Sequence, residues 1–248
     1  NSSVGWGIFY WVVNIGAFMG PLLAGYLRHE FSWKHLFLAS AMITALNYLM
    51  LFTFKDFESG ADKTENPVHV FVRTIKNIFE PRLISWLLIM SCFWLMMYQL
   101  WDLHPNFLTD WNDSRDVAAF IHKIPFLPDG WVIDTVRGPQ VAQEYMLNLN
   151  AGLIILLMIP ISWLVRRLRA LESMVIGMTI ATVGILVAGF TNIGGIFLLG
   201  VVFFSLGEML TGPKKNEYLG LIAPPGKKGL YLGYVNIPVG IGGYVGST

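Results

Sequence analysis

Long apolar runs are the feature of this chain that most restricts its fold. A transmembrane helix needs about 20 mostly apolar residues to cross the hydrocarbon core of a bilayer. The six complete runs are 4–27, 35–54, 83–101, 145–165, 173–190 and 195–212. A seventh begins near Gly229 and is cut short, so we interpret the chain as part of a longer protein. The sequence predicts an all-α membrane protein, a helical bundle with six full transmembrane helices and a truncated seventh.

The composition agrees with a membrane protein and argues against other classes. Hydrophobic residues make up 54% of the chain and charged residues 13%, which is outside the range of ordinary soluble domains. The net charge of +1 gives no basic field for nucleic acid. Cys92 is the single cysteine, so no internal disulfide framework is possible. The sequence contains no HExxH, GxSxG or phosphate-loop motif, and we expect neither an enzyme nor a bound cofactor or metal.

The basic residues predict an orientation. If successive loops alternate between the two sides, twelve Lys and Arg residues fall on one side and five on the other. The side with the excess is cytoplasmic by the positive-inside rule, and the polar loop 102–144 faces outside. We expect a multi-pass protein of the plasma membrane. The twelve are Lys55, Lys63, Arg73, Lys76, Arg82, Arg166, Arg167, Arg169, Lys214, Lys215, Lys227 and Lys228. The five are Arg28, Lys34, Arg115, Lys123 and Arg137.

Two further patterns concern packing. The segment 67–80 has apolar residues on one helical face, which indicates an amphipathic helix along the membrane surface. Small residues recur at four-residue spacing inside the runs, which favours close approach of helix backbones. They are Gly16, Gly20 and Ala24, then Gly177 and Ala181, then Gly242 and Gly246.

Among the polar residues inside the apolar runs, the candidates for a functional role are Asn14, Gln99, Asn150 and Glu208. A charge at the centre of a bilayer costs about 3 kcal/mol, so such residues usually face a partner or a water-filled cavity. A carboxylate in such a cavity can bind an ammonium group or take up a proton. The amides have a simpler alternative role as links between helices, worth about 0.6 kcal/mol each. Glu208 is therefore the first candidate for substrate binding and proton coupling.

The ends of two runs carry further polar groups. Asp102 and His104, just after the third run, are candidates to extend a proton path, although a solvated loop position is the favoured interpretation. Gly212 and Pro213 are interpreted as the end of the sixth helix. The following Lys214-Lys215 pair then suits an anionic membrane surface.

Three blocks of residues resemble the proton-dependent oligopeptide transporter family of the major facilitator superfamily. Phe9-Tyr10, Asn14 and Gly16 are similar to the FYxxxNxG signature of the family's fifth span, and Phe93-Trp94 with Gln99 resembles FWxxxxQ in its seventh. The tenth-span pattern is matched by Glu208, Pro213 and Ala223-Pro224, and the eighth-span Asn and Pro by Asn150 and Pro160. The spans here correspond to spans five to eleven of twelve.

The resemblance implies a secondary transporter that carries out proton-coupled symport of di- and tripeptides by alternating access. It implies that 1–54 holds the last two helices of an N-terminal bundle, 55–82 a cytoplasmic linker with the amphipathic helix, and 83–248 an incomplete C-terminal bundle. The implied substrate-binding residues are Tyr10, Asn14, Gln99, Asn150 and Glu208, with Glu208 meeting the peptide's amino terminus. The proton-coupling candidates are Glu208 and Asp102.

One departure keeps other functions open. Tyr98 stands where many members of the family have an aspartate, which favours a different cargo for the carrier, such as a drug, a sugar or another small organic solute. A receptor or scaffold that binds a ligand without transporting it is a further alternative, favoured by the long outer loop 102–144. In each case the expected partners are a small-molecule substrate, protons and the lipid bilayer.

Overall fold

The structure of the chain is a computed structural model that describes residues 2–53, 55 and 66–247. It divides into two compact units, one formed by Asn1–Pro21 with Trp86–Thr248 and the other by Leu22–Ser85. Six helices within the described residues are long and apolar enough to span a membrane, which confirms the predicted number. Phe54 and Lys63, which belong to a predicted span and to the predicted cytoplasmic charges, lie outside the described residues.

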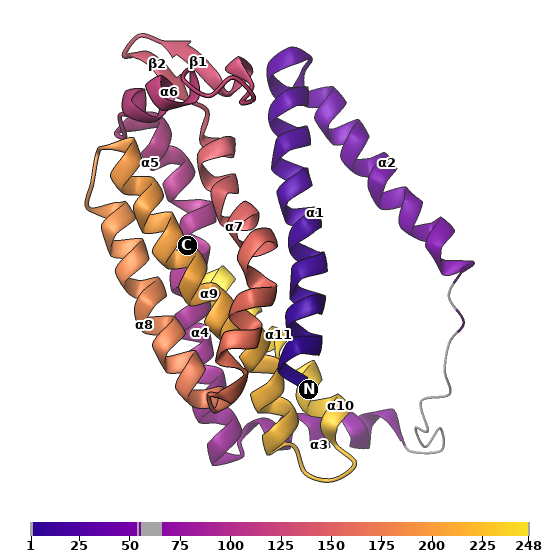
Figure 1. Cartoon of the computed structure of the whole chain (residues 1–248). Coiled ribbons are helices and arrows are strands. Elements are labelled where there is room, and N and C mark those ends of the chain that lie inside the picture. Colours follow the sequence, from indigo (N-terminus) through magenta and orange to yellow (C-terminus); the bar gives the residue numbers. More distant parts are fainter. Residues whose placement is uncertain (1, 54, 56–65, 248) are drawn as a thin grey trace. The chain divides into compact units, whose positions relative to one another are not determined.

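Five long helices build the first unit, and two of them begin or end in the second (Figure 1). Their backbone polar groups bond within each helix, which is what a lipid environment requires. These helices are α1 (Ser2–Glu30), α4 (Pro81–Asp102), α7 (Gln143–Leu164), α8 (Ala170–Gly189) and α9 (Gly194–Ile222).

Helices α8 and α9 pack against each other along facing small residues. A Cβ placed on Gly200 of α9 would lie 2.7 Å from the carbonyl oxygen of Gly184 of α8. One placed on Gly207 would lie 2.7 Å from the Cβ of Ala181. The backbones therefore touch, as the predicted packing role of Gly177 and Ala181 requires. At Gly16 and Gly20, by contrast, an added Cβ would meet no described atom within 4 Å, so the packing role of these two residues stays a prediction.

The first part of α1 runs antiparallel to α7. The indole Nε1 of Trp11 donates to the carbonyl of Ile155 at 2.7 Å. Further toward the end of α1, the amide of Asn148 donates to the carbonyl of Phe18 at 3.1 Å. The residue numbers of these two hydrogen bonds rise along α1 and fall along α7, so the bonds fix the register of two antiparallel helices. This register decides which side chain of α1 faces α9.

The predicted outer loop is folded rather than extended. It contains α5 (His104–Asp110), α6 (Arg115–Ile121), the short 3-10 helix η1 (Asp129–Trp131) and the strands β1 (Val132–Thr135) and β2 (Gly138–Val141). The strands form an antiparallel hairpin at one end of the first unit (Figure 1). Gly138 closes the turn with φ +96°, a conformation that side chains with a Cβ rarely adopt.

This loop is attached to the start of α9. The carboxylate of Asp116 accepts a hydrogen bond from the backbone amide of Gly195 at 2.7 Å. The backbone of Asp113 exchanges two further bonds with this region, to the carbonyl of Asn192 at 2.7 Å and from the amide of Gly194 at 2.8 Å. A carboxylate at a helix N-terminus satisfies free N–H groups and complements the helix dipole. The loop thus caps α9.

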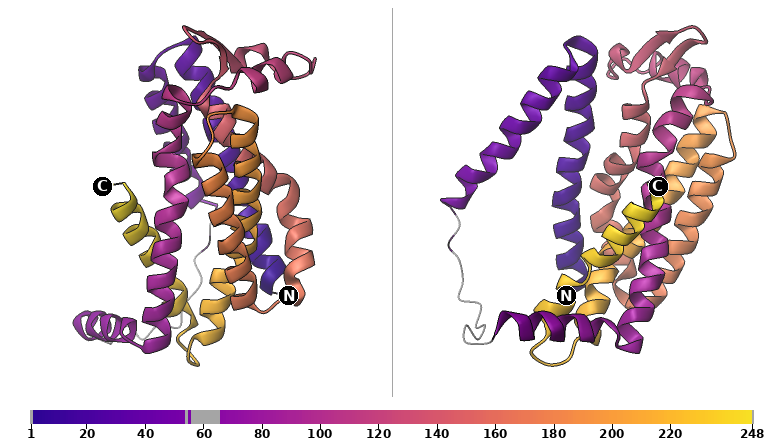
Figure 2. Two further views of the ribbon diagram at one scale, coloured as in Figure 1. Left: turned by 90° about the vertical axis from the view of Figure 1, so that its left-hand side faces the viewer. Right: turned by 180° about the vertical axis from the view of Figure 1, so that it is seen from behind.

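The seventh apolar run forms two short helices instead of one. These are α10 (Lys228–Gly233) and α11 (Asn236–Gly246), with α11 passing in front of α4 in the view from behind (Figure 2, right). Pro238 lies in the first turn of α11, where its missing N–H costs nothing. In a continuous helix its ring would clash with the carbonyl of Tyr234, and the chain turns at that residue.

The second unit contains the turn after α1 and two helices, α2 (Trp33–Leu51) and α3 (Pro67–Ile78). The guanidinium of Arg28 lies 5.3 Å from the centre of the Trp33 ring across the turn. Asn66 caps α3 by accepting from the amide of Val68 at 2.9 Å. A helix therefore occupies most of the predicted amphipathic segment, while its position on a membrane surface stays a prediction.

Candidate binding site between helices α1, α7 and α9

Helix α9 continues ten residues beyond the predicted end at Gly212. Pro213 lies inside the helix, and α8 supports this region because Ser173 Oγ donates to the carbonyl of Leu210 at 3.0 Å. Proline is tolerated within membrane helices where neighbouring helices satisfy the backbone. The prediction that Gly212-Pro213 ends the span was therefore wrong. The two lysines that follow belong to the helix and not to a surface loop.

Glu208 projects from α9 toward α1 and α7, and both of its carboxylate oxygens accept hydrogen bonds. The hydroxyl of Tyr10 on α1 donates to Oε1. The amide of Asn150 on α7 donates to Oε2 at 2.9 Å and to Ser205 Oγ at 3.0 Å. Charge-assisted bonds of this kind are roughly twice as strong as neutral ones. Three helices thus converge on one acidic group.

Gly212 makes room for this arrangement. A Cβ at Gly212 would lie 3.1 Å from Cζ of Tyr10, so the ring of Tyr10 rests directly on the backbone of α9. Below the polar cluster, Ile154, Met158 and Met209 form a buried apolar core with Tyr10 packed against it. The apolar packing fixes the ring and points its hydroxyl at Glu208.

Lys215 lies on the same face of α9, seven residues after Glu208. Its Nζ is 4.3 Å from the centre of the Trp94 ring on α4, a cation–π contact. The charges of Lys215 and Glu208 also interact through space. Within the described part of the chain, Lys215 forms no hydrogen bond or ion pair through Nζ. The polar cluster therefore contains an acid with both oxygens occupied and a cation held by an aromatic face.

The other residues expected in the site form no hydrogen bond to Glu208 among the described residues, although Asn14 lies one turn from Tyr10 and interacts with its side chain. Asn14 is buried, but its amide donates to the carbonyl of Tyr10 on the same helix at 2.9 Å. Gln99 donates to the carbonyl of Gly246 on α11 at 3.2 Å. Asp102 accepts from the hydroxyl of Ser247 at 2.6 Å and is exposed. The structure therefore brings together Tyr10, Asn150 and Glu208, and places Gln99 and Asp102 beside the last helix.

The position of His104 differs from the prediction. It was interpreted as a solvated loop residue, but only 6% of its surface is exposed. Its ring lies 5.6 Å from that of Phe197, and Nδ1 is 2.8 Å from the carbonyl oxygen of Gln99. His104 packs the loop onto α9, and no hydrogen bond among the described residues links it to Glu208.

The arrangement of helices around a polar centre agrees with a comparison of the whole sequence. The profile of the Major Facilitator Superfamily matches residues 1–247. The chain belongs to the major facilitator superfamily. This is a family of membrane transporters and not of enzymes, so the chain is a multi-pass membrane protein.

Similarity to individual members of the superfamily is low. Over 119 residues, 47% of this chain, it is 25% identical to multidrug resistance protein MdtH of Yersinia enterocolitica and to that of Proteus mirabilis. It is 26% identical over 117 residues to MdtH of Aeromonas hydrophila. These matches cover 29%, 30% and 29% of the relatives, so the chain aligns with less than a third of each.

Lys214 was predicted to lie at the membrane surface together with Lys215, and the structure contradicts this for Lys214. Only 1% of its surface is exposed. Its Nζ lies 3.1 Å from Oε2 of Glu217 and donates to the carbonyl of Leu168 at 3.2 Å. Leu168 belongs to the turn between α7 and α8, so Lys214 ties that turn to α9. Lys214 therefore lies beside the basic turn, but it is buried in the protein and does not face a membrane surface.

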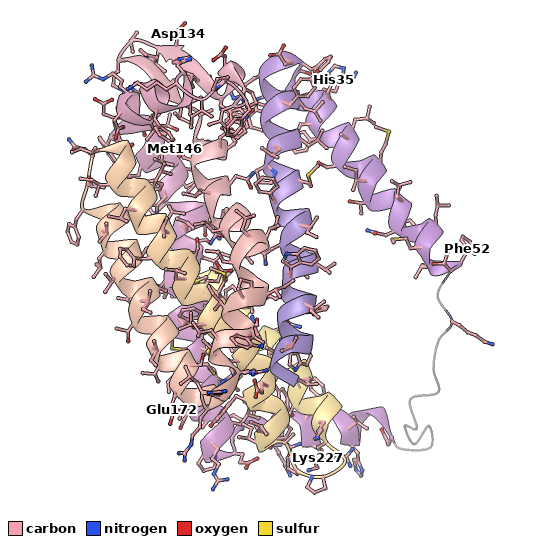
Figure 3. All side chains as sticks on the ribbon, in the orientation of Figure 1. His35, Phe52, Asp134, Met146, Glu172 and Lys227 are labelled. Atoms are coloured by element: carbon pink, nitrogen blue, oxygen red, sulfur yellow. The ribbon has the colours of Figure 1, made fainter. Side chains whose placement is uncertain are left out.

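The remaining connections of the first unit alternate as the orientation prediction requires. Asp134 of the hairpin lies at one end of this unit, while Glu172 and Lys227 lie at the opposite end (Figure 3). Glu172 lies in the first turn of α8, shortly after the arginines of the α7–α8 turn. The basic turn and the folded loop thus occupy opposite ends, and the cytoplasmic assignment of the basic end stays a prediction.

Sequence reasoning missed Lys215 as a charged neighbour of the acid, Trp94 as the aromatic partner of Lys215, and Ser205 as a second acceptor for Asn150. The signal for Lys215 was present. Seven residues of an α-helix make almost two full turns, so positions 208 and 215 share a face. Pro213 hid this relationship because it was interpreted as a helix end.

Proposed function

We propose that this chain forms the central part of a proton-coupled secondary transporter that moves a small organic solute by alternating access. Di- and tripeptides are the first substrates to test, because the sequence blocks around Tyr10, Asn150 and Glu208 resemble those of oligopeptide transporters. The proposal places the protein in the plasma membrane with its basic turn in the cytoplasm. Protons and one solute are its transported partners.

The observation that carries the proposal is the convergence of three helices on the Glu208 carboxylate. An acidic group between membrane helices is a functional site by default, because ionisation there is expensive without partners. Tyr10 and Asn150 stabilise the ionised form, while water-accessible states of the carrier allow protonation. A group that exchanges a proton and changes its bonds to α1 and α7 can couple proton movement to helix movement.

A second candidate keeps the mechanism and changes the cargo. The relatives found in the comparison are named multidrug resistance proteins, and Tyr98 replaces an aspartate of the oligopeptide family. Both observations favour an apolar or aromatic organic solute over a peptide. The sites of the two candidates are the same, so a substrate panel separates them.

The decisive experiment uses the full-length protein in proteoliposomes. Solute-driven proton uptake is measured with a panel of dipeptides and aromatic drugs, for the native protein and for Glu208→Gln. Glu172→Gln is the matched control, because Glu172 is an exposed carboxylate in the first turn of α8. We expect Glu208→Gln to abolish proton uptake and Glu172→Gln to leave it unchanged. Normal coupling in Glu208→Gln would remove this residue from the mechanism and overturn the proposal.

A further inference from the structure

We propose that Lys215 is the anion-binding group of this site and that the transported solute carries a carboxylate or a similar anionic group. This inference rests on the proposed transport function. It changes the expected chemistry of recognition, because the resemblance implied that the principal charge contact is between Glu208 and an ammonium group of the substrate.

The carboxylate of Glu208 already has hydrogen-bond donors within the protein. Glu208 accepts one hydrogen bond on each oxygen, from Tyr10 and from Asn150. An incoming ammonium group would have to compete with two donors that are held in place by helix packing. The carboxylate is therefore already engaged by the protein.

The ammonium group of Lys215, by contrast, has hydrogen-bond donors to spare. Lys215 has three N–H donors, and its Nζ contacts the face of Trp94. An aromatic face attracts the positive charge but accepts no strong hydrogen bond. No acceptor in the described part of the chain bonds to Nζ, so all three donors are available to a ligand. An anion placed there would gain charge-assisted hydrogen bonds that the protein itself does not supply.

Trp94 is held in position by the close packing of α11 against α4. A Cβ on Gly242 of α11 would lie 2.6 Å from Cβ of Trp94, and one on Gly243 would lie 3.0 Å from the ring of Tyr98. The Tyr98 and Trp94 rings lie 5.9 Å apart. The glycines of α11 therefore allow close packing behind this aromatic pair, and the pair presents a face to Lys215. Tyr98, which departs from the oligopeptide family, takes part in this support.

Protonation of Glu208 should affect the binding of an anion at Lys215. The titratable groups facing Glu208 in the described structure are Tyr10 on α1 and Lys215 on α9, while α7 contributes the neutral Asn150. When Glu208 is ionised, its charge opposes that of Lys215. When Glu208 is protonated, the positive charge of Lys215 is uncompensated and attracts an anion more strongly. A proton and an anionic solute are therefore expected to bind together.

The test uses pairs of solutes that differ only in the anionic group. The probes are alanylalanine with alanylalanine amide, and benzoate with benzamide; tetraphenylphosphonium is the cationic comparison. Uptake into proteoliposomes is measured for the native full-length protein, Lys215→Gln and Lys215→Arg. Lys228→Gln is the matched control, since Lys228 is exposed at the end of the first unit.

We expect the native protein to prefer at least one carboxylate over its amide by about ten-fold, the size of a bond to a charged group. Lys215→Gln should bring this ratio close to one, Lys215→Arg should keep most of it, and Lys228→Gln should not change it. In a pH titration, carboxylate binding to the native protein should become stronger toward lower pH, and Glu208→Gln should remove this dependence.

Each contrary result has a separate meaning. Proton-coupled uptake of tetraphenylphosphonium or the amides, with no effect of Lys215→Gln, would overturn the anion site and leave the transport proposal standing. A preference for carboxylates that survives in Lys215→Gln would also overturn it. If no probe is taken up and Glu208→Gln changes nothing, both proposals fail. Thermal unfolding of each variant separates loss of binding from loss of folding, and Lys215→Arg provides a second variant that keeps the charge.

Discussion

Tyr10 and Glu208 are 198 positions apart in the chain and share a hydrogen bond from the phenol hydroxyl to a carboxylate oxygen. The contact exists because α1 lies antiparallel to α7 and because Gly212 leaves space for the phenol ring on α9. Asn150 then reaches the second oxygen from α7. Packing of apolar surfaces thus determines the surroundings of the one acid on which the proposed mechanism depends.

Tyr10→Phe removes the phenol hydroxyl and keeps the packing of the ring. A hydrogen bond between membrane helices is worth about 1–2 kcal/mol in peptides and about 0.6 kcal/mol on average in an intact membrane protein. We expect solute-driven proton uptake to fall about three- to thirty-fold. Tyr244→Phe is the control, because Tyr244 is exposed on α11. Equal activity of the two variants would contradict a coupling role for Tyr10.

Gly200→Ala tests the contact between α8 and α9. The added Cβ would lie 2.6 Å from the backbone nitrogen of Ala188 and 2.7 Å from the carbonyl oxygen of Gly184, and backbone atoms cannot move aside easily. We expect a loss of about 1–3 kcal/mol in stability, seen as a lower unfolding temperature in detergent. Gly189→Ala is the matched control because its Cβ would meet no described atom within 4 Å. Equal unfolding temperatures would show that the helices are further apart than described.

Lys214→Met tests whether this residue is a buried anchor or a surface charge. The change removes the ion pair with Glu217 and the bond to the carbonyl of Leu168. Breaking a buried pair by removing one member costs about 3–5 kcal/mol, whereas an exposed lysine contributes little. The unfolding temperature should fall strongly for Lys214→Met and hardly at all for Lys228→Met. The double variant Lys214→Met, Glu217→Gln should regain part of the loss; similar results for the two single variants would favour the surface interpretation.

The pH dependence of the folded loop should come from Asp113. Hydrogen bonds from the Arg115 side chain, and next from its backbone amide, hold the pKa of Asp113 well below its usual range. Because the folded-state pKa is lowered, the contribution to stability is present above the unfolded pKa of about 3.9 and is lost as the pH falls through the folded value. The pair is exposed, so we expect a local effect and no change in overall stability.

Hydrogen exchange of the loop amides, corrected for intrinsic rates, measures this effect. Protection in residues 112–116 should be constant between about pH 5 and 8 and should decrease only well below about pH 4. Asp113→Asn should lower protection at neutral pH and remove the acid transition. Loss of protection between pH 6 and 5 would point to another titrating group.

The sequence by itself determined the number of membrane helices and most of their boundaries. Hydropathy is a local property, and a helix in lipid must satisfy its backbone bonds within the segment, so the run 173–190 specifies α8 (Ala170–Gly189) without reference to its neighbours. The same reasoning singled out Glu208 and Asn150, because polar groups inside such runs are costly wherever they point. Local signals failed at Pro213, which continues a helix, whereas Pro238 accompanies a break. The difference depends on packing against neighbouring helices.

Only the tertiary structure decided which polar groups meet. Asn14 and Asn150 are similar in sequence as single amides inside apolar runs, yet one bonds to its own helix and the other bonds to Glu208. Lys214 and Lys215 are adjacent, but one is a buried anchor and the other faces Trp94. The physical reason is that successive residues of a helix point about 100° apart, so their surroundings are set by the helices on each side. The sequence determined what had to be buried in the membrane, and the packing of helices determined the partners.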